Sequence, residues 1–129
     1  MSSPRKYVPI IHGAVVLVAV LFGIVTLIAG GRVLAGADPG YIVFRPLLIY
    51  NVTMGFAYMA AGIIMWRSLD RGRYAAAAIF LLNLVVYIAI VYLYTTGAPV
   101  AIDSVRAMTL RTGVWLALFI ASGWLLRRR

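Results

Sequence analysis

Two arginines lie five residues apart in the segment DSVRAMTLRTGVW, residues 103–115, which leads into an apolar stretch. An arginine guanidinium binds carboxylates and phosphates through a planar fork of N–H donors. At the end of a membrane helix, the same side chain anchors the helix at the lipid headgroups. Arg106 and Arg111 therefore indicate either an anion site or interfacial anchoring, and we take anchoring as the first interpretation.

An anion site at this place would draw on more than these two residues. The other candidates are basic residues that should lie at the same membrane surface, together with two aspartates near them. The complete set is Arg32, Arg45, Arg106 and Arg111, with Asp38 and Asp103. Such a cluster would bind an anion or an acidic partner. Trp115, one turn after Arg111, would hold that guanidinium by a cation–π contact.

Residues suited to catalysis or metal binding are scarce. The chain has no cysteine, which excludes disulfides and thiolate chemistry. We expect Asp38, Asp70 and Asp103 to lie in loops between the apolar runs, and therefore expect no carboxylate proton carrier within the membrane. The single histidine, His12, is interpreted as a packing residue rather than a haem or metal ligand. We expect no enzyme activity and no cofactor, with a membrane enzyme or quinone-linked redox component as the alternative.

The elements that position these residues follow from the composition. The 129 residues are 64% hydrophobic, with a mean hydropathy of +1.01, which exceeds what the core of one small soluble domain can hide. Apolar runs at 8–29, 46–66, 74–94 and 108–126 are each close to the roughly 20 residues that a helix needs to cross a hydrocarbon layer of about 30 Å. We predict one all-α domain over 1–129, an integral membrane bundle of four transmembrane helices.

The net charge of +9 is distributed in the manner of a membrane protein rather than of a nucleic-acid-binding surface, because basic residues lie at the ends of the apolar runs. With both termini inside, eight basic residues face the cytoplasm and four face outward. The inner set is Arg5, Lys6, Arg67, Arg71, Arg73, Arg127, Arg128 and Arg129. We therefore predict an N-in, C-in protein of a prokaryotic cytoplasmic (inner) membrane, with no nucleic-acid partner. A cleaved signal peptide is the alternative, which the length of the first run disfavours.

Short connections separate the runs. The segments GADPG at 36–40 and TTGAP at 95–99 are rich in turn-forming residues. The segment RSLDRGR at 67–73 is a short charged link. We expect it to fold the second and third helices into a tight antiparallel hairpin.

The position of Arg111 within the apolar run 108–126 sets its depth in the membrane and therefore its expected role. If Arg127 marks the inner boundary, Arg111 lies 16 residues away, or about 24 Å at about 1.5 Å per residue. Arg111 would then lie slightly inside the outer boundary of a hydrocarbon layer of about 30 Å. We therefore expect its side chain to extend outward to headgroups or water.

Asn83 lies too deep to reach either membrane surface, so its amide needs a protein partner. If the link between the second and third helices is centred between Asp70 and Arg71, Asn83 shares its depth with Tyr58. We predict that the amide and the phenol meet near the midplane.

Small residues recur on one side of several helices. Because apolar side chains gain little by leaving lipid for each other, membrane helices pack best where small residues let their backbones approach. These faces should turn to the bundle interior or to a partner subunit. The residues predicted to pack are Gly23, Gly55, Gly62, Gly113, Ala117 and Ala121.

Two functions remain open. The first is a non-enzymatic accessory, assembly or interaction subunit, which associates with itself or with a larger membrane complex through its small-residue faces. The alternative is a small transporter or channel for an anion or amphiphile. In that alternative the outer arginines gather the solute, and Asn51, Tyr58, Asn83 and Tyr87 line its route.

We assign no family from these residues. The chain has no glutamate, which small multidrug-resistance exporters use in their first helix. The run AIFLLNLVVYIAIVYLY lacks the phenylalanine- and serine-rich break of fluoride channels. The hairpin AGIIMWRSLDRGRYAAAAIFLLNL loosely resembles DoxX-like membrane proteins, but its helix, basic link and second helix form a pattern that many membrane proteins share.

Overall fold

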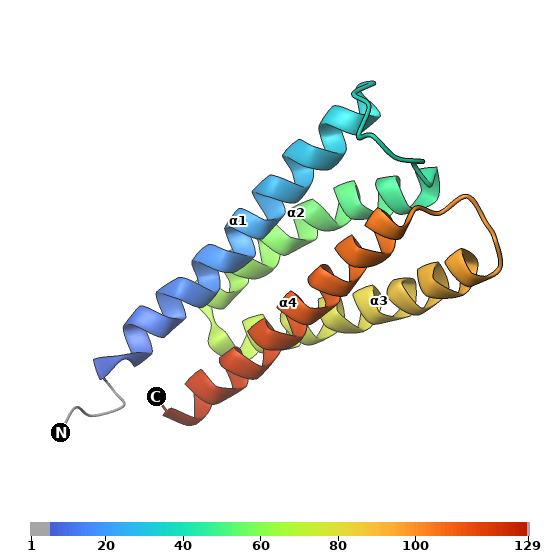
Figure 1. Cartoon of the computed structure of the whole chain (residues 1–129). Coiled ribbons are helices and arrows are strands. Elements are labelled where there is room, and N and C mark those ends of the chain that lie inside the picture. The colour runs from blue at the N-terminus through green and yellow to red at the C-terminus, as the bar shows by residue number, and fades with distance from the viewer. Residues whose placement is uncertain (1–5, 129) are drawn as a thin grey trace.

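The computed structural model describes residues 6–128, which form four helices joined by short connections (Figure 1). The helices are α1 (Val8–Leu34), α2 (Arg45–Arg67), α3 (Leu69–Thr95) and α4 (Ile102–Arg128). Each is long and apolar enough to cross a membrane. The two ends of the chain lie at the same end of the bundle (Figure 1). The predicted all-α bundle of four transmembrane helices is therefore confirmed.

The helices are longer than the apolar runs that predicted them. Three of them have 27 residues, or about 40 Å at about 1.5 Å per residue, which exceeds a hydrocarbon layer of about 30 Å. The prediction that Asp70 and Asp103 lie in loops is wrong, because they occupy the first turns of α3 and α4. The helices extend beyond the apolar runs because backbone hydrogen bonding does not require apolar side chains. An aspartate in the first turn also stabilises a helix, because its negative charge lies near the positive end of the helix dipole.

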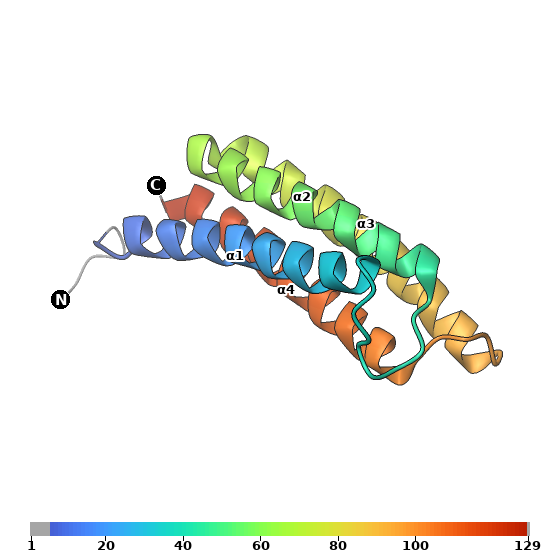
Figure 2. The same cartoon turned by 90° about the horizontal axis from the view of Figure 1, so that it is seen from above.

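The link between α2 and α3 is shorter than predicted. Only Ser68 separates the two helices, and its hydroxyl accepts a hydrogen bond from the Arg71 N–H at 3.4 Å. A Cβ at Gly72 would lie 2.6 Å from the Cα of Met65, so this corner of the chain requires glycine. The turn is thus tight, but α2 packs more extensively on α1 than on α3, and α3 packs mainly on α4 (Figure 1). Seen from above, α1 and α4 lie on one side of the bundle and α2 and α3 on the other (Figure 2).

Glycines make the α1–α2 contact close. A Cβ at Gly23 would lie 2.7 Å from the carbonyl oxygen of Gly55, and a Cβ at Gly62 would lie 3.2 Å from the Cβ of Ala19. Gly23, Gly55 and Gly62 thus lie where α1 and α2 approach most closely. The other two connections turn through glycines with positive φ, which are Gly36, Gly40 and Gly97.

The small-residue face of α4 behaves differently. Gly113 and Ala117 are exposed, and a Cβ built on Gly113 meets no atom within 4 Å. Ala121 is half-buried against the core. Of the two predicted orientations, bundle interior or partner subunit, the first is therefore wrong for Gly113 and Ala117. The side of α4 that carries Met108, Trp115 and Ser122 faces the other helices instead.

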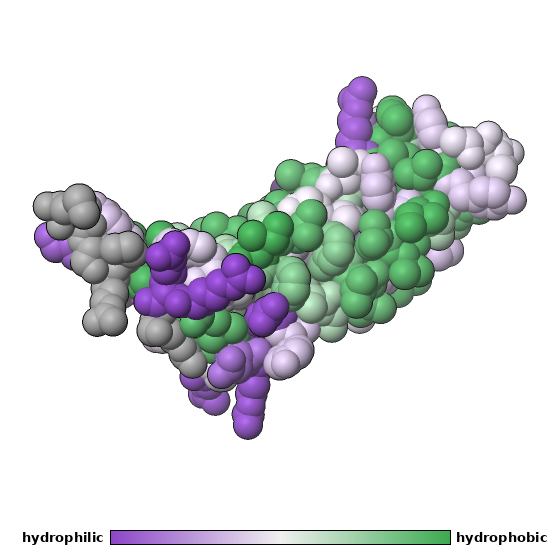
Figure 3. All heavy atoms as spheres, turned by 90° about the horizontal axis from the view of Figure 1, so that it is seen from below, coloured by the Kyte–Doolittle hydropathy of each residue, from purple (hydrophilic) through white to green (hydrophobic). Residues whose placement is uncertain are grey.

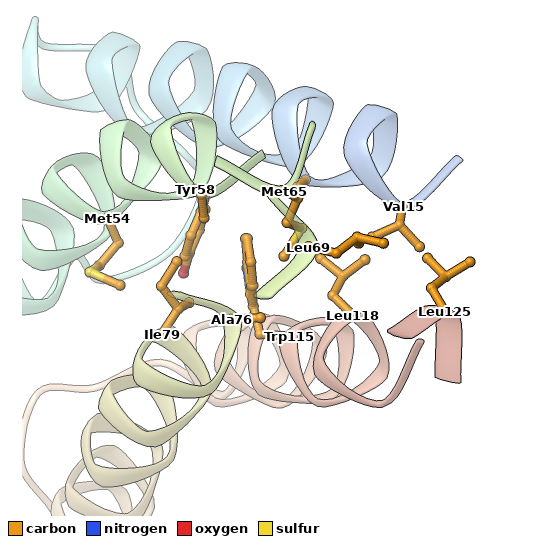
Figure 4. Close-up of a cluster of buried hydrophobic side chains, with 12 residues drawn as sticks. Val15, Met54, Tyr58, Met65, Leu69, Ala76, Ile79, Trp115, Leu118 and Leu125 are labelled. Atoms are coloured by element: carbon orange, nitrogen blue, oxygen red, sulfur yellow. The ribbon is translucent and has the colours of Figure 1, made fainter. Parts of the chain in front are cut away.

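The core runs along the bundle axis between the four helices (Figure 4). Tyr58, Trp115, Met65 and Leu125 are fully buried there. Large apolar side chains also cover the outside, as at Phe56 and Val85, which are 64% and 66% exposed. Such a surface suits lipid rather than water.

Polar residues gather at the ends of the bundle. Figure 3 shows an apolar middle and a concentration of hydrophilic atoms at the end that holds the two chain termini. This end carries Arg67, Arg71, Arg73, Arg127 and Arg128 with Lys6, whereas Arg5 and Arg129 lie outside the described residues. We call this the terminal end and the opposite one, with the connections 35–44 and 96–101, the loop end.

Candidate functional site

A polar cluster lies at the centre of the bundle. The Asn83 Nδ2 donates to the Tyr58 hydroxyl oxygen at 3.1 Å, and the Tyr58 hydroxyl lies 3.3 Å from Asn83 Oδ1. The predicted contact between this amide and this phenol is confirmed. The Tyr50 hydroxyl also donates to Asn83 Oδ1, at 2.8 Å. Asn83 is thus satisfied inside the protein, with no exposed surface.

Tyr50 is a partner of Asn83 that the depth argument did not predict. Because the link is Ser68 alone, the centre of the hairpin moves two to three residues toward the N-terminus. The α2 position facing Asn83 then shifts from Tyr58 toward Thr53, which lies between the two tyrosines. Both phenols therefore reach the same amide from opposite sides along α2.

Aromatic rings surround this cluster and fill the interior. Tyr58 stacks on Trp115 with ring centroids 5.0 Å apart (Figure 4). The ring centroids of Tyr58 and Phe22 are 5.5 Å apart. Tyr58, Asn83 and Trp115 have no exposed surface. At this level the bundle is closed by protein side chains.

Arg111 lies toward the loop end from these rings. Its Nη1 donates to the Thr26 hydroxyl on α1 at 2.8 Å, and its guanidinium carbon lies 5.7 Å from the centroid of the Phe22 ring. The expectation of an outward-extending side chain is therefore wrong, because the guanidinium crosses to α1 and is half-buried. Phe22 also takes the place predicted for Trp115, whose ring is occupied by its stack with Tyr58.

A partly open cavity of about 350 Å³ lies at the loop end, between α1, α2, α4 and the connection that follows α1. We call it the outer cavity. Its charged and amide-bearing lining residues are Arg32, Asp38, Asn51 and Arg111, and Thr26 also lines it. Apolar lining residues, such as Val33, Phe44, Leu47 and Leu48, make up most of the remainder.

The predicted arginine cluster is only partly assembled. Arg32 and Arg111 line the outer cavity, whereas Arg45 and Arg106 are exposed and do not. Asp38 lines the cavity and accepts a hydrogen bond from the Gly40 N–H at 2.8 Å, so it stabilises its own turn. Asp103 is exposed. The outer site is thus smaller than the sequence predicted, because arginines on different helix faces point in different directions.

The predicted solute route is also divided. Asn51 lines the outer cavity, while Tyr58 and Asn83 are buried below it and do not line it. The hydroxyl of Tyr87 accepts from the Thr109 hydroxyl at 3.0 Å, which joins α3 to α4 away from the cavity. These four residues therefore do not form one continuous polar path.

At the terminal end, His12 links two helices. The ring Nε2–H donates to the carbonyl oxygen of Met65 at 2.7 Å. Because α2 ends at Arg67, this carbonyl is one of the last in the helix, where the intrahelical donors run out. His12 is therefore a packing residue that caps α2 from α1, as interpreted. Among the described residues, no group of three or more histidine, aspartate or glutamate side chains is placed to hold a metal ion.

Within residues 6–128, three buried side-chain polar atoms have no hydrogen-bond partner, and two of them belong to residues that line the outer cavity. These two are Asn51 Oδ1 and Arg111 Nε, and the third is Trp115 Nε1. Comparisons of the chain with protein-family models, with curated proteins and with solved structures found no match. The site is therefore interpreted from its geometry alone.

Proposed function

We propose that this protein is a non-enzymatic membrane subunit that works by associating with other membrane helices, with a second copy of the chain as the partner we test. The observation that carries this proposal is the closed interior. Tyr58, Asn83 and Trp115 have no exposed surface, so their side chains close the middle of the bundle that residues 6–128 form. The sides of the bundle remain available for contact with other membrane helices.

One side is suited to close helix contact. Gly113 and Ala117 lie one turn apart on α4, are exposed, and continue toward the half-buried Ala121. Helices in lipid approach most closely across such small residues. Arg111 points to α1 from another side of the same helix, so contacts at Gly113 would leave the outer cavity intact.

Cysteine crosslinking tests this proposal with little background, because the chain contains no cysteine. Ala117→Cys should form a disulfide-linked dimer in native membranes, visible at twice the 14.1 kDa chain mass. Leu82→Cys is the matched control, because Leu82 is 51% exposed on α3 at a similar distance from the helix ends. We expect no dimer from Leu82→Cys.

A second variant separates association from folding. Adding Gly113→Leu to Ala117→Cys should abolish the dimer, because the larger side chain keeps the backbones apart, while the thermal stability of the monomer stays unchanged. Equal crosslinking of the two cysteine variants would show that the contact is random and would contradict the proposal.

Transport of an anion or amphiphile is the second candidate, and the outer cavity with Arg111 favours it. The closed interior means that transport would require the packing around Tyr58 and Trp115 to open. Liposomes that contain the protein should therefore pass small anions no faster than protein-free liposomes. Anion flux faster than in protein-free liposomes would contradict the association proposal and support transport as the function.

A further inference from the structure

We propose that the outer cavity is a binding site for an amphiphilic monoanion, a carboxylate or phosphate attached to an apolar body, held through Arg111. This inference does not depend on association through α4. The cavity is built from α1, α2 and the inward side of α4, whereas the proposed contact uses the outward side.

The first support is the charge of Arg111. No carboxylate among the described residues pairs with this guanidinium, which interacts with the neutral hydroxyls of Thr26 and Tyr58 and with the Phe22 ring. It is the tenth residue of α4 and half-buried, so water compensates its charge only in part. A cation at such a depth is unfavourable unless an anion or a polar group balances it. An anion in the adjoining cavity would supply the missing charge.

The second support is unused hydrogen-bonding capacity. Arg111 Nε is a buried donor without a partner, and an anion in the adjoining cavity would accept its hydrogen bond. Asn51 Oδ1, which lines the same cavity, is a buried acceptor without a partner and requires a donor rather than an anion. Buried polar groups in proteins are otherwise nearly always paired. The unpaired donor of Arg111 is therefore the part of this imbalance that an anion in the cavity would remove.

The third support is the net charge of the lining. Arg32 and Arg111 are positive, and Asp38 is negative, which leaves one net positive charge. Asp38 is held in its turn by the Gly40 N–H, so it stays at the rim formed by the connection after α1. A single negative charge on the ligand therefore balances the site.

The size and composition of the cavity define the rest of the ligand. A volume of about 350 Å³ exceeds what one carboxylate or phosphate group fills and lies at the lower end of the range for small-molecule pockets. Val33, Phe44, Leu47 and Leu48 would contact the remainder of the ligand, which must be apolar. A membrane phospholipid and a free fatty acid share this chemistry, and the experiment separates them.

The test measures laurate binding to the purified chain in a neutral detergent by native mass spectrometry. Dodecanol has the same chain without the charge, and acetate has the charge without the chain. We expect one laurate per chain, bound at least about tenfold more tightly than either comparison compound. Acetate binding as tightly as laurate, or dodecanol binding as tightly as laurate, would overturn the proposal.

Variants locate the site. Arg111→Gln should weaken laurate binding by at least about tenfold, because it removes the charge that pairs with the carboxylate. Arg106→Gln is the matched control, since it makes the same change on the same helix at an exposed arginine outside the cavity. Equal laurate affinity of the two variants would overturn the proposal.

A further pair of measurements covers misfolding and the source of the ligand. If Arg111→Gln does not fold, Arg111→Lys tests the proposal instead, because lysine keeps the positive charge. This variant should still bind laurate more tightly than dodecanol. Equal affinity for the two compounds would contradict the proposal. In nanodiscs, phosphatidylglycerol that competes with laurate where phosphatidylcholine does not would identify a bilayer lipid as the ligand. An absence of competition would identify a free amphiphile.

Discussion

Asn83 is the residue on which the polar part of the core depends. Its amide accepts from the hydroxyls of Tyr50 and Tyr58 and donates to the latter, so one side chain satisfies two phenols. These phenols extend from α2, whereas Asn83 belongs to α3. The cluster therefore specifies how two helices that pack only moderately on each other are aligned.

We predict that Asn83→Ala destabilises the folded bundle by about 1–2 kcal/mol, because two buried hydroxyls lose their acceptor. The measurement is unfolding of the purified protein by sodium dodecyl sulfate in mixed micelles. Tyr87→Phe serves as the control, because Thr109 keeps its bond to the Val105 carbonyl. That change should cost less than about 0.5 kcal/mol. A loss for Asn83→Ala no larger than for Tyr87→Phe would show that the cluster adds little.

Arg111 shows how a neighbouring helix decides the direction of a side chain. Its distance from the membrane boundary permits contact with the headgroups, but Thr26 and Phe22 of α1 offer a hydroxyl and a ring at the same depth. A hydrogen bond and a cation–π contact together hold the guanidinium beside the outer cavity. The anion-binding role proposed for Arg111 depends on that position.

At the scale of elements, α1 and α2 form the closest pair. Gly23 and Gly55 meet backbone to backbone, while Gly62 accommodates Val20 and Ala19. The α3–α4 pair is the other extensive contact, and the Tyr87–Thr109 hydrogen bond belongs to it. The bundle is therefore two helical hairpins, with Ser68 as the short connection between them.

We predict opposite effects for alanine at two glycines. Gly23→Ala places a Cβ 2.7 Å from the Gly55 oxygen and 2.9 Å from the Met59 nitrogen, and backbone atoms cannot give way cheaply. The expected loss of unfolding free energy is about 1–3 kcal/mol. Gly113→Ala meets open space, so stability should be unchanged or rise by up to about 1 kcal/mol.

Unfolding in detergent at high dilution, where association is absent, measures both changes. Equal losses at the two positions would mean that the α1–α2 glycines are not in close contact in the folded protein.

At the scale of the whole molecule, the start of α1 and the end of α4 lie at one end of the bundle (Figure 1). Most of the basic residues within 6–128 lie at that end too, where Figure 3 shows hydrophilic residues. Positive charge favours the cytoplasmic side of a membrane. The N-in, C-in orientation and the inner membrane therefore remain predictions of this charge distribution, and they place the outer cavity on the external side.

Labelling of single cysteines tests the orientation. Thr96→Cys lies in the connection between α3 and α4, and Arg128→Cys lies at the terminal end. A membrane-impermeant maleimide should modify Thr96→Cys in intact cells and Arg128→Cys only after the membrane is opened. The reverse pattern would place the terminal end outside, and the outer cavity would then face the cytoplasm.

The sequence by itself determined the class of the protein and the number of its helices. Lipid contact demands about 20 consecutive apolar residues, and this requirement is local, so composition alone reveals it. The Asn83–Tyr58 contact was equally accessible, because a short hairpin link fixes which positions share a depth. The glycines of the α1–α2 contact were found because small residues are needed wherever membrane helices approach.

Only the tertiary structure decided which way each helix face turns. In a soluble protein, the periodicity of apolar residues distinguishes the buried face of a helix from the exposed face. Here nearly all helix faces are apolar, so the sequence pattern around the exposed Gly113 and Ala117 resembles that around the buried Gly23. The outer cavity likewise depends on three helices and a connection far apart in sequence. Arg111 lines the cavity, whereas Arg45 and Arg106 do not. The rotation of each helix about its own axis decides this, and in a membrane that rotation is set by packing between helices rather than by the transfer of apolar side chains out of water.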